Sequence, residues 1–230
     1  MDIKILENKI KIIQNKFSAG QFDEVISDAK LLLKKFSNQQ ILYNILSLTY
    51  QKKGENIKSI DLLTNAIKKI PNNIFFLNNL GTSYYNIKNF EEAEYYFKRA
   101  LEINPKYITA INNLANLKYD LDLIDEAKKL YNQALELNNN LLEPNYNLAS
   151  FSQTTGDFDK AIYHYKKVLK INPKFTKADR NISMMTKYFL ESEHFIENHY
   201  EIIDESNVIP ITIKCPRRID SILDSLQYSD

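Results

Sequence analysis

The sequence has a single cysteine and almost no net charge, and each shortage excludes a class of protein. Cys215 has no second cysteine to pair with, so an intrachain disulfide is excluded and the composition gives no support for secretion. The chain has 30 Lys and Arg residues and 29 Asp and Glu residues, and the resulting net charge of +1 provides no overall attraction to nucleic acid. We therefore predict no nucleic-acid partner.

Long apolar runs are also missing. No stretch reaches the roughly 18 consecutive apolar residues that a membrane-spanning helix needs. The amino-terminal stretch MDIKILENKIKIIQNKF is apolar at every third or fourth position, but charges interrupt it throughout. It contains neither the apolar block nor the cleavage site of a signal peptide. From these absences we predict a cytoplasmic protein with no membrane partner.

Glycine and proline are scarce, and their positions are periodic. Only four glycines and six prolines occur in 230 residues. Pro71 and Pro105 lie 34 residues apart, and Pro173 follows after two further periods. Three of the glycines repeat this spacing, at Gly20, Gly54 and Gly156. Because these two residue types interrupt helices, the spacing marks the turns of a repeated unit, and a fixed period of this length is typical of a solenoid.

Small and large side chains recur in columns at the same period. One column holds only small residues: Ser47, Gly81, Ala115, Ala149 and Ser183. Another holds large ones: Leu63, Phe97, Tyr131 and Tyr165. A third starts with tyrosine and then lapses: Tyr50, Tyr84, Lys118 and Ser152. Small residues let two helices approach closely and large residues fill the space between them, so each unit is predicted to be a pair of packed helices.

These columns resemble the tetratricopeptide repeat family, whose signature combines a 34-residue period, a small–large–small pattern and a closing proline. The resemblance covers about residues 6–190. It implies an all-α, right-handed superhelical solenoid of antiparallel helix pairs. The expected domain, 1–190, contains repeats at 6–39, 40–73, 74–107, 108–141 and 142–175 and a capping helix at 176–190.

Residues 191–230 fall outside the period and are expected to form an irregular C-terminal tail. The stretch VIPITIKCP is typical of an extended segment. After it, Ile219, Ile222, Leu223 and Leu226 occupy one face of a predicted short helix. Two interpretations remain: the tail folds back over the last helices, or it begins a docking segment or a truncated second domain.

Asparagine recurs in register along the predicted first helix of each pair. The longer column contains Asn79, Asn113, Asn147 and Asn181, and a shorter column beside it contains Asn44, Asn78 and Asn112. Asparagine is roughly 0.6 kcal/mol less favourable than alanine inside a helix, so four in one column would cost on the order of 2–3 kcal/mol. The columns are therefore expected to have a purpose, either as ligands or as bonds between repeats, unless they reflect drift in an asparagine-rich chain.

The family resemblance implies that this part of the first helix lines the concave face of the superhelix. The columns would then form an asparagine ladder similar to that in the repeat domain of O-linked N-acetylglucosamine transferases. An amide offers one acceptor and two donors, so it can pair with both the N–H and the C=O of an extended peptide. The other predicted groove residues are Thr82, Tyr85, Asn116, Tyr119, Tyr146, Lys177 and Arg180.

Lys177 and Arg180 form a basic end of this candidate groove. They could take a carboxylate or a phosphate, and the alternative is an ordinary solvated helix face. No catalytic constellation accompanies them. His194 and His199 are five residues apart and fall on different faces of a helix, and four glycines leave no phosphate-binding loop. We predict no enzymatic activity, no cofactor and no metal.

The sequence therefore predicts a non-catalytic scaffold that binds an extended polypeptide in the concave groove through the asparagine ladder. The alternative is a substrate-recruiting arm of a glycosyl- or sulfotransferase whose catalytic domain is not in this chain. A third hypothesis is self-association through the ends of the solenoid.

Overall fold

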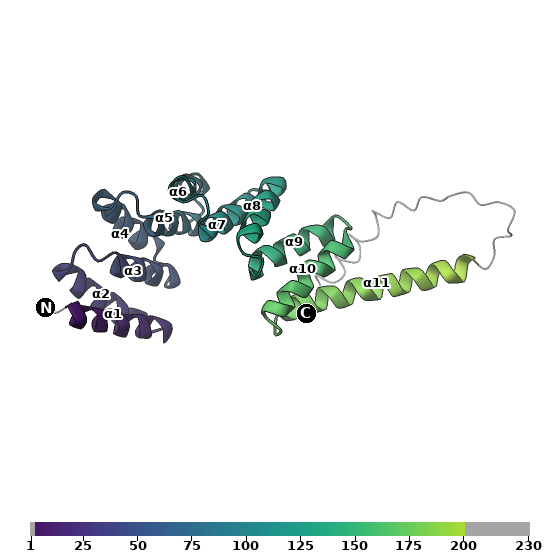
Figure 1. The fold of residues 1–230 in the computed structure, drawn as a ribbon, viewed down its shortest axis with the longest axis horizontal. Coiled ribbons are helices and arrows are strands. Elements are labelled where there is room, and N and C mark those ends of the chain that lie inside the picture. The colour runs from purple at the N-terminus through teal and green to yellow at the C-terminus, as the bar shows by residue number, and fades with distance from the viewer. Residues whose placement is uncertain (1–2, 201–230) are drawn as a thin grey trace. The chain divides into compact units, whose positions relative to one another are not determined.

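Residues 3–200 are described by a computed structural model of the chain, in which every regular element is an α-helix (Figure 1). The surroundings of side chains are described for residues 5–188. The all-α fold predicted from the sequence is confirmed for this part of the chain, which contains no strand. The chain divides into two compact units, residues 1–139 and residues 140–230.

Consecutive helices pack in pairs within each unit. Unit 1 contains α1 (Ile3–Ser18), α2 (Phe22–Lys35), α3 (Gln40–Lys52), α4 (Asn56–Lys69), α5 (Ile74–Asn86), α6 (Phe90–Ile103), α7 (Ile108–Asp120) and α8 (Ile124–Leu137). Unit 2 contains α9 (Leu142–Thr154), α10 (Phe158–Ile171) and α11 (Thr176–Tyr200). The odd-numbered helices are called first helices below, and the even-numbered ones second helices. Helix α11 starts where the capping helix was expected and continues beyond residue 190, whereas the predictions for 201–230 lie outside the described residues.

Short polar side chains begin several of these helices. The carboxamide of Asn73 accepts hydrogen bonds from the backbone N–H groups of Phe75 and Phe76 at the start of α5, both at 3.0 Å. Asp157, the residue before α10, accepts one from the N–H of Lys160 at 3.4 Å. Such bonds satisfy donors that the first turn of a helix leaves without an intrahelical acceptor.

The turn inside each pair passes through a residue with positive φ. These residues are spaced 34 apart, and their φ angles are 74°, 74°, 64°, 60° and 78° at Gly20, Gly54, Lys88, Asp122 and Gly156. The positive φ of the glycine column is therefore kept at Lys88 and Asp122, two positions of the same column that carry side chains. Glycine enters this region without the clash between Cβ and the backbone that other residues meet.

Replacing Asp122 by glycine should raise the free energy of unfolding by about 0.5–1 kcal/mol, because the steric penalty of about 1–2 kcal/mol is partly offset by the greater freedom of glycine in the unfolded chain. Thermal denaturation followed by circular dichroism would measure it. The converse substitution, Gly54→Asp, is the control and should lower stability. A lower melting temperature for Asp122→Gly would contradict this account.

Gly81 shows why one column is restricted to small residues. A Cβ added to Gly81 would lie 2.6 Å from two atoms of the Phe97 ring. Phe97 is itself fully buried, together with Ala93 and Ala100 on the same helix. The predicted packing of small residues against large ones is thus present, and it brings α5 and α6 into close contact.

The tyrosine column lapses at α7, in the fourth helix pair, where an ion pair takes the place of the tyrosine. Lys118 of α7 is buried, and its Nζ lies 2.8 Å from Glu94 Oε1 of α6 and 3.2 Å from Glu126 Oε2 of α8. Burial alone would lower the pKa of Lys118, but hydrogen bonds to the two carboxylates outweigh it and raise that pKa. Burial alone would likewise raise the pKa of Glu94, and hydrogen bonds from two lysines lower it instead.

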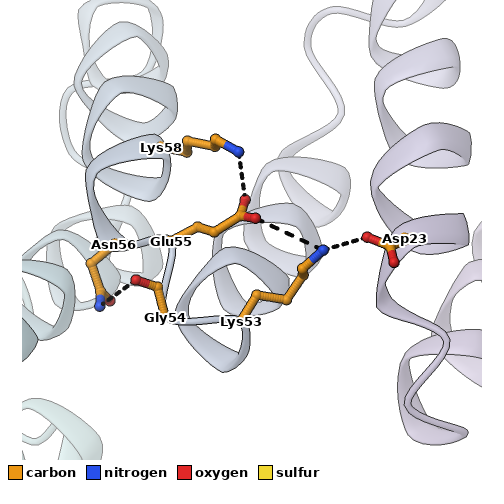
Figure 2. Close-up of polar contacts among 6 residues, drawn as sticks. All are labelled: Asp23, Lys53, Gly54, Glu55, Asn56 and Lys58. Atoms are coloured by element: carbon orange, nitrogen blue, oxygen red, sulfur yellow. Dashed lines mark hydrogen bonds and ion pairs between the residues drawn. The ribbon is translucent and has the colours of Figure 1, made fainter.

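Ion pairs also join the first two helix pairs near the ends of their helices (Figure 2). Lys53, after α3, forms an ion pair with Asp23 of α2 and lies 3.8 Å from Glu55. Glu55 in turn accepts a hydrogen bond from Lys58 at 2.9 Å. The bond to Asp23 raises the pKa of Lys53, and the bond from Lys58 lowers the pKa of Glu55. Because these groups reach solvent, the pairs contribute little to stability.

Among residues 3–200, each helix is too short or too polar to cross a bilayer.

Candidate functional site

The two asparagine columns lie on the first helices of successive pairs, as the sequence predicted. Asn78 and Asn79 of α5 are only 3% and 6% exposed. The remaining members are partly buried: Asn44, Asn112, Asn113, Asn147 and Asn181. At this degree of burial, most of the amide atoms contact other protein atoms and are not open to a ligand.

Within unit 1 the two columns bond to each other. Asn79 Nδ2 of α5 donates to Asn44 Oδ1 of α3 at 2.5 Å, and Asn113 Nδ2 of α7 donates to Asn78 Oδ1 of α5 at 3.0 Å. Each bond joins a residue to the one 35 positions before it. The longer column thus supplies the donors and the shorter column the acceptors of a contact that recurs between neighbouring first helices.

Hydroxyl groups support both amide bonds. Asn79 Nδ2 also lies 3.3 Å from Ser47 Oγ, and Asn113 Nδ2 lies 3.3 Å from Thr82 Oγ1. Nearby, Ser83 Oγ of α5 lies 2.8 Å from Ser59 Oγ of α4. The first helices α3, α5 and α7 are therefore joined by buried and partly buried polar groups that bond to one another, which lowers the cost of placing such groups between helices.

An apolar pair occupies the same register between the first two pairs. Ile45 of α3 aligns with Asn79, and the residue 35 positions before it is Ile10 of α1. Both isoleucines are buried in one core cluster. The chain thus provides both an amide version and an apolar version of the same junction, which favours a packing role for the paired amides.

In unit 2 the last asparagine of the column has a different partner. Asn181 Nδ2 of α11 donates to the hydroxyl oxygen of Tyr165 at 2.7 Å, and that hydroxyl donates to Gln153 Oε1 at 2.9 Å. Burial raises the pKa of Tyr165 to about 12, against the opposing effect of the bond from Asn181. The ring of Tyr146 packs beside that of Tyr165, with 5.7 Å between their centroids.

The remaining predicted groove residues fall into two groups. In unit 1, Tyr85 donates its hydroxyl to Asp120 Oδ2 at 2.5 Å, and Asn116 Oδ1 accepts from the Tyr131 hydroxyl at 2.6 Å. Tyr119 is half-exposed on α7. In unit 2, the basic residues are exposed on α11: Lys177 and Arg180.

Helices α3, α5 and α7 differ from the second helices of unit 1 in charge, whereas the first helix α1 carries several lysines and Glu7. Helix α3 carries no charged residue before Lys52, its last residue, and α5 carries none. Helix α7 carries only the buried Lys118 before Asp120. The second helices α4, α6 and α8 are rich in Lys, Glu and Asp. We call the uncharged columns of α3, α5 and α7 the neutral face: Ile41, Phe75, Thr109, Asn44, Asn78, Asn112, Leu48, Thr82, Asn116, Gln51, Tyr85 and Tyr119.

The members of the neutral face that the sequence reasoning missed include two large apolar residues. Ile41 and Phe75 are exposed although they are large and apolar. The Phe75 ring meets that of Tyr107 edge-on at 5.8 Å between centroids. The signal was available, because Ile41, Phe75 and Thr109 share one column of the 34-residue period. Exposed aromatic rings at such a position provide contact area for a partner.

The described part of the chain holds no group of three or more His, Cys, Asp or Glu side chains arranged for a metal ion. His164, half-buried on α10, has Nδ1 2.9 Å from Asn145 Oδ1. Burial lowers the pKa of His164, with a smaller contribution from Lys167. The side chains of His194, His199 and Cys215 lie outside the described residues.

Two sequence models of the tetratricopeptide repeat match the chain, one over residues 74–107 and one over residues 106–174. These ranges cover helices α5 to α10, whose pairing and 34-residue turns have the geometry described above. Residues 74–174 therefore carry tetratricopeptide repeats. A comparison with curated protein sequences found no significant match.

Solved tetratricopeptide structures share the fold at low sequence identity. TTC0263 of Thermus thermophilus is 20% identical, with a TM-score of 0.66 over 77% of this chain and 97% of that one. PilF of Pseudomonas aeruginosa is 17% identical, with a TM-score of 0.67 over 75% and 78%. YrrB, described as a tetratricopeptide protein with an unusual peptide-binding site, is 18% identical, with a TM-score of 0.54 over 75% and 89%. The expected likeness to the ladder of O-linked N-acetylglucosamine transferases is not confirmed.

Proposed function

We propose that this tetratricopeptide repeat protein is a non-catalytic scaffold that binds an extended, uncharged polypeptide segment along the neutral face of unit 1. Repeats of this family and fold support a protein-interaction role in general. The finer proposal rests on one observation: α3, α5 and α7 carry no exposed charge before Lys52 and Asp120, which are the last residues of α3 and α7. YrrB, with its peptide-binding site, offers a precedent on a similar fold.

The neutral face supports recognition of a peptide backbone. Within residues 5–188, no hydrogen bond is made by Asn44 Nδ2 or by Asn113 Oδ1, although the other amide atom of each residue is engaged. One donor group and one acceptor group are thus left on partly exposed amides. A peptide unit could use both, and each bond would contribute roughly 0.5–1.5 kcal/mol.

Apolar contact supplies the second part of the proposal. Phe75 and Ile41 are exposed on adjacent first helices, and Tyr119 is exposed on the next. Rings and branched side chains of this kind act as anchors for a bound segment, whereas surrounding contacts are close to neutral in energy. The scarcity of charge disfavours strongly charged peptides, because an ion brought to the part of this face away from Asp120 loses water and gains no counter-ion.

The test is selection of binders from a phage-displayed library of random peptides on the full chain, followed by affinity measurements. Phe75→Ala should weaken the selected peptides by about tenfold, the effect of losing one anchor worth roughly 1.4 kcal/mol. Tyr95→Ala is the matched control, because Tyr95 is 53% exposed on a second helix and Phe75 is 50% exposed on a first helix. Alanine at the paired asparagines is a poorer probe, since it also removes bonds between repeats.

The salt dependence separates this proposal from charge-driven binding. Affinity for the neutral face should change by less than about twofold between low and high salt, because screening acts only on charges. Peptides that bind Phe75→Ala and Tyr95→Ala equally well, or that are released by salt, would count against the proposal. The transferase-arm alternative stays a prediction. Whether Lys177 and Arg180 take a carboxylate or a phosphate, or form an ordinary solvated helix face, is likewise untested.

A further inference from the structure

A second surface, on the helix pair of α1 and α2, is apolar and only partly covered. Ile12 of α1 is 52% exposed and Leu31 of α2 is 58% exposed. A cavity of about 190 Å³ lies between them, and Lys9 and Asp28 complete its wall. We call these four residues, with the buried Ile13 and Leu32 beneath them, the α1/α2 surface.

The 34-residue register shows what this surface is built to contact. Ile12 aligns with Leu46 and Leu80 in the next two first helices. Leu80 is fully buried in a cluster with Leu63 and Ala66 of α4, the second helix of the preceding pair. Leu46 is buried in the same way in a cluster that includes residues of α2. Ile12 thus occupies a position that, elsewhere in unit 1, packs against a helix from a neighbouring pair.

The charges around the cavity favour a copy of the same surface as the partner. Lys9 stands on α1 and Asp28 on α2, at opposite walls of the cavity. Lys16 Nζ lies 2.8 Å from a carboxylate oxygen of Glu24 and of Asp28. Two lysines, Lys9 and Lys16, and two acids, Glu24 and Asp28, thus surround the cavity, and their formal charges sum to zero. Lys9 makes no ion pair within residues 5–188.

We propose that the α1/α2 surface is the interface of a homodimer with twofold symmetry, which is independent of peptide binding at the neutral face. In a twofold interface the same patch is used by both copies, so a patch with apolar residues at its centre and opposite charges at its two walls is self-complementary. Lys9 of one copy then meets Asp28 of the second, twice, around a core made by Ile12 and Leu31. A surface of a single sign would repel its own copy.

Analytical ultracentrifugation of the full chain tests this inference. The mass should double as the concentration rises from about 1 µM to about 100 µM, a range in which dimers of modest affinity form. Ile12→Glu/Leu31→Glu should stay at the mass of a single chain. Ile57→Glu is the matched control, because Ile57 is 58% exposed on α4 and lies outside this surface. Circular dichroism verifies that each variant keeps its helices.

A charge exchange tests the symmetry. Lys9→Glu should raise the dissociation constant of the dimer at least about tenfold, since two like-charge contacts replace two attractive ones. Lys9→Glu/Asp28→Lys should recover most of the affinity, with Glu24 remaining as a partner for Lys16. A single-chain mass at every concentration would overturn the proposal. So would a dimer insensitive to Ile12→Glu/Leu31→Glu.

Discussion

Replacing Glu94 by alanine should lower the free energy of unfolding by about 2–4 kcal/mol, close to the cost of removing one partner from a buried ion pair. The side chain of Lys118 is 10% exposed, and its Nζ would keep only Glu126, whose side chain is 54% exposed. A buried ammonium that loses its nearer carboxylate retains its desolvation penalty without the compensating attraction. Urea denaturation followed by circular dichroism measures the change.

Two further variants make this expectation specific. Glu102→Ala removes an exposed acid from the same helix and should change stability by less than about 0.5 kcal/mol. Lys118→Tyr restores the residue type of the two preceding pairs. It should be far less damaging than Glu94→Ala, because it removes the buried ammonium and with it the need for a carboxylate partner. If Glu94→Ala were as stable as Glu102→Ala, the ion pair would not stabilise the junction of α6, α7 and α8.

Acid should erase the difference between Glu94→Ala and the wild type. The folded protein lowers the pKa of Glu94 from its ordinary value of 4.5, through hydrogen bonds from lysine that outweigh burial. A group with a depressed pKa contributes stability above its unfolded pKa and loses that contribution as pH falls through the folded value. The two denaturation curves should therefore converge as the pH drops below 4.5. A constant gap would contradict this assignment.

Asn79→Ala should lower the free energy of unfolding by about 2 kcal/mol, because Asn44 Oδ1 and Ser47 lose their shared donor in a partly buried site. This loss exceeds the roughly 0.6 kcal/mol that alanine gains in helix propensity. Asn65→Ala is the control, since the Asn65 amide is exposed and bonds only within its own helix. Chemical denaturation of both variants gives the comparison.

The double variant Asn44→Ile/Asn79→Ile should be closer to the wild type than either single variant. Replacing both partners of a hydrogen bond with apolar groups leaves no buried polar atom without a partner. Ile10 and Ile45 already form this arrangement one junction earlier, in a buried cluster. The double-mutant cycle should show a coupling energy of about 0.5–3 kcal/mol. Strict additivity would mean that the two amides do not act as a pair.

Much of the fold could be predicted because its signals are local. The conformation of a turn depends on the residue that occupies it, which is why Gly20, Gly54 and Gly156 marked the turns correctly. The columns of small and large residues predicted the packing of Gly81 against Phe97 for the same reason. The positive φ of two further turns was not predicted, since the residue types of Lys88 and Asp122 do not favour it.

The candidate site was predicted less completely. The asparagine columns were visible, and bonds between repeats were one of the alternatives, but the spacing of 34 did not show that the bonds run from a residue to the one 35 positions earlier. A hydrogen-bond partner depends on how two helices are offset, and no local propensity encodes that offset. Binding of a peptide by these amides stays a prediction, and the neutral face became visible only when exposure was added to the sequence pattern.

By itself, the sequence determined the period, the helix pairs, the positions of the turns and the family, because each depends on which residues recur along a single chain. The tertiary structure alone decided that the two asparagine columns pair with each other, that Lys118 is buried between two carboxylates, and that Ile12 is exposed where its counterparts are buried. The physical reason is that these properties belong to pairs of residues from different helices, whose contacts are set by packing and not by the period.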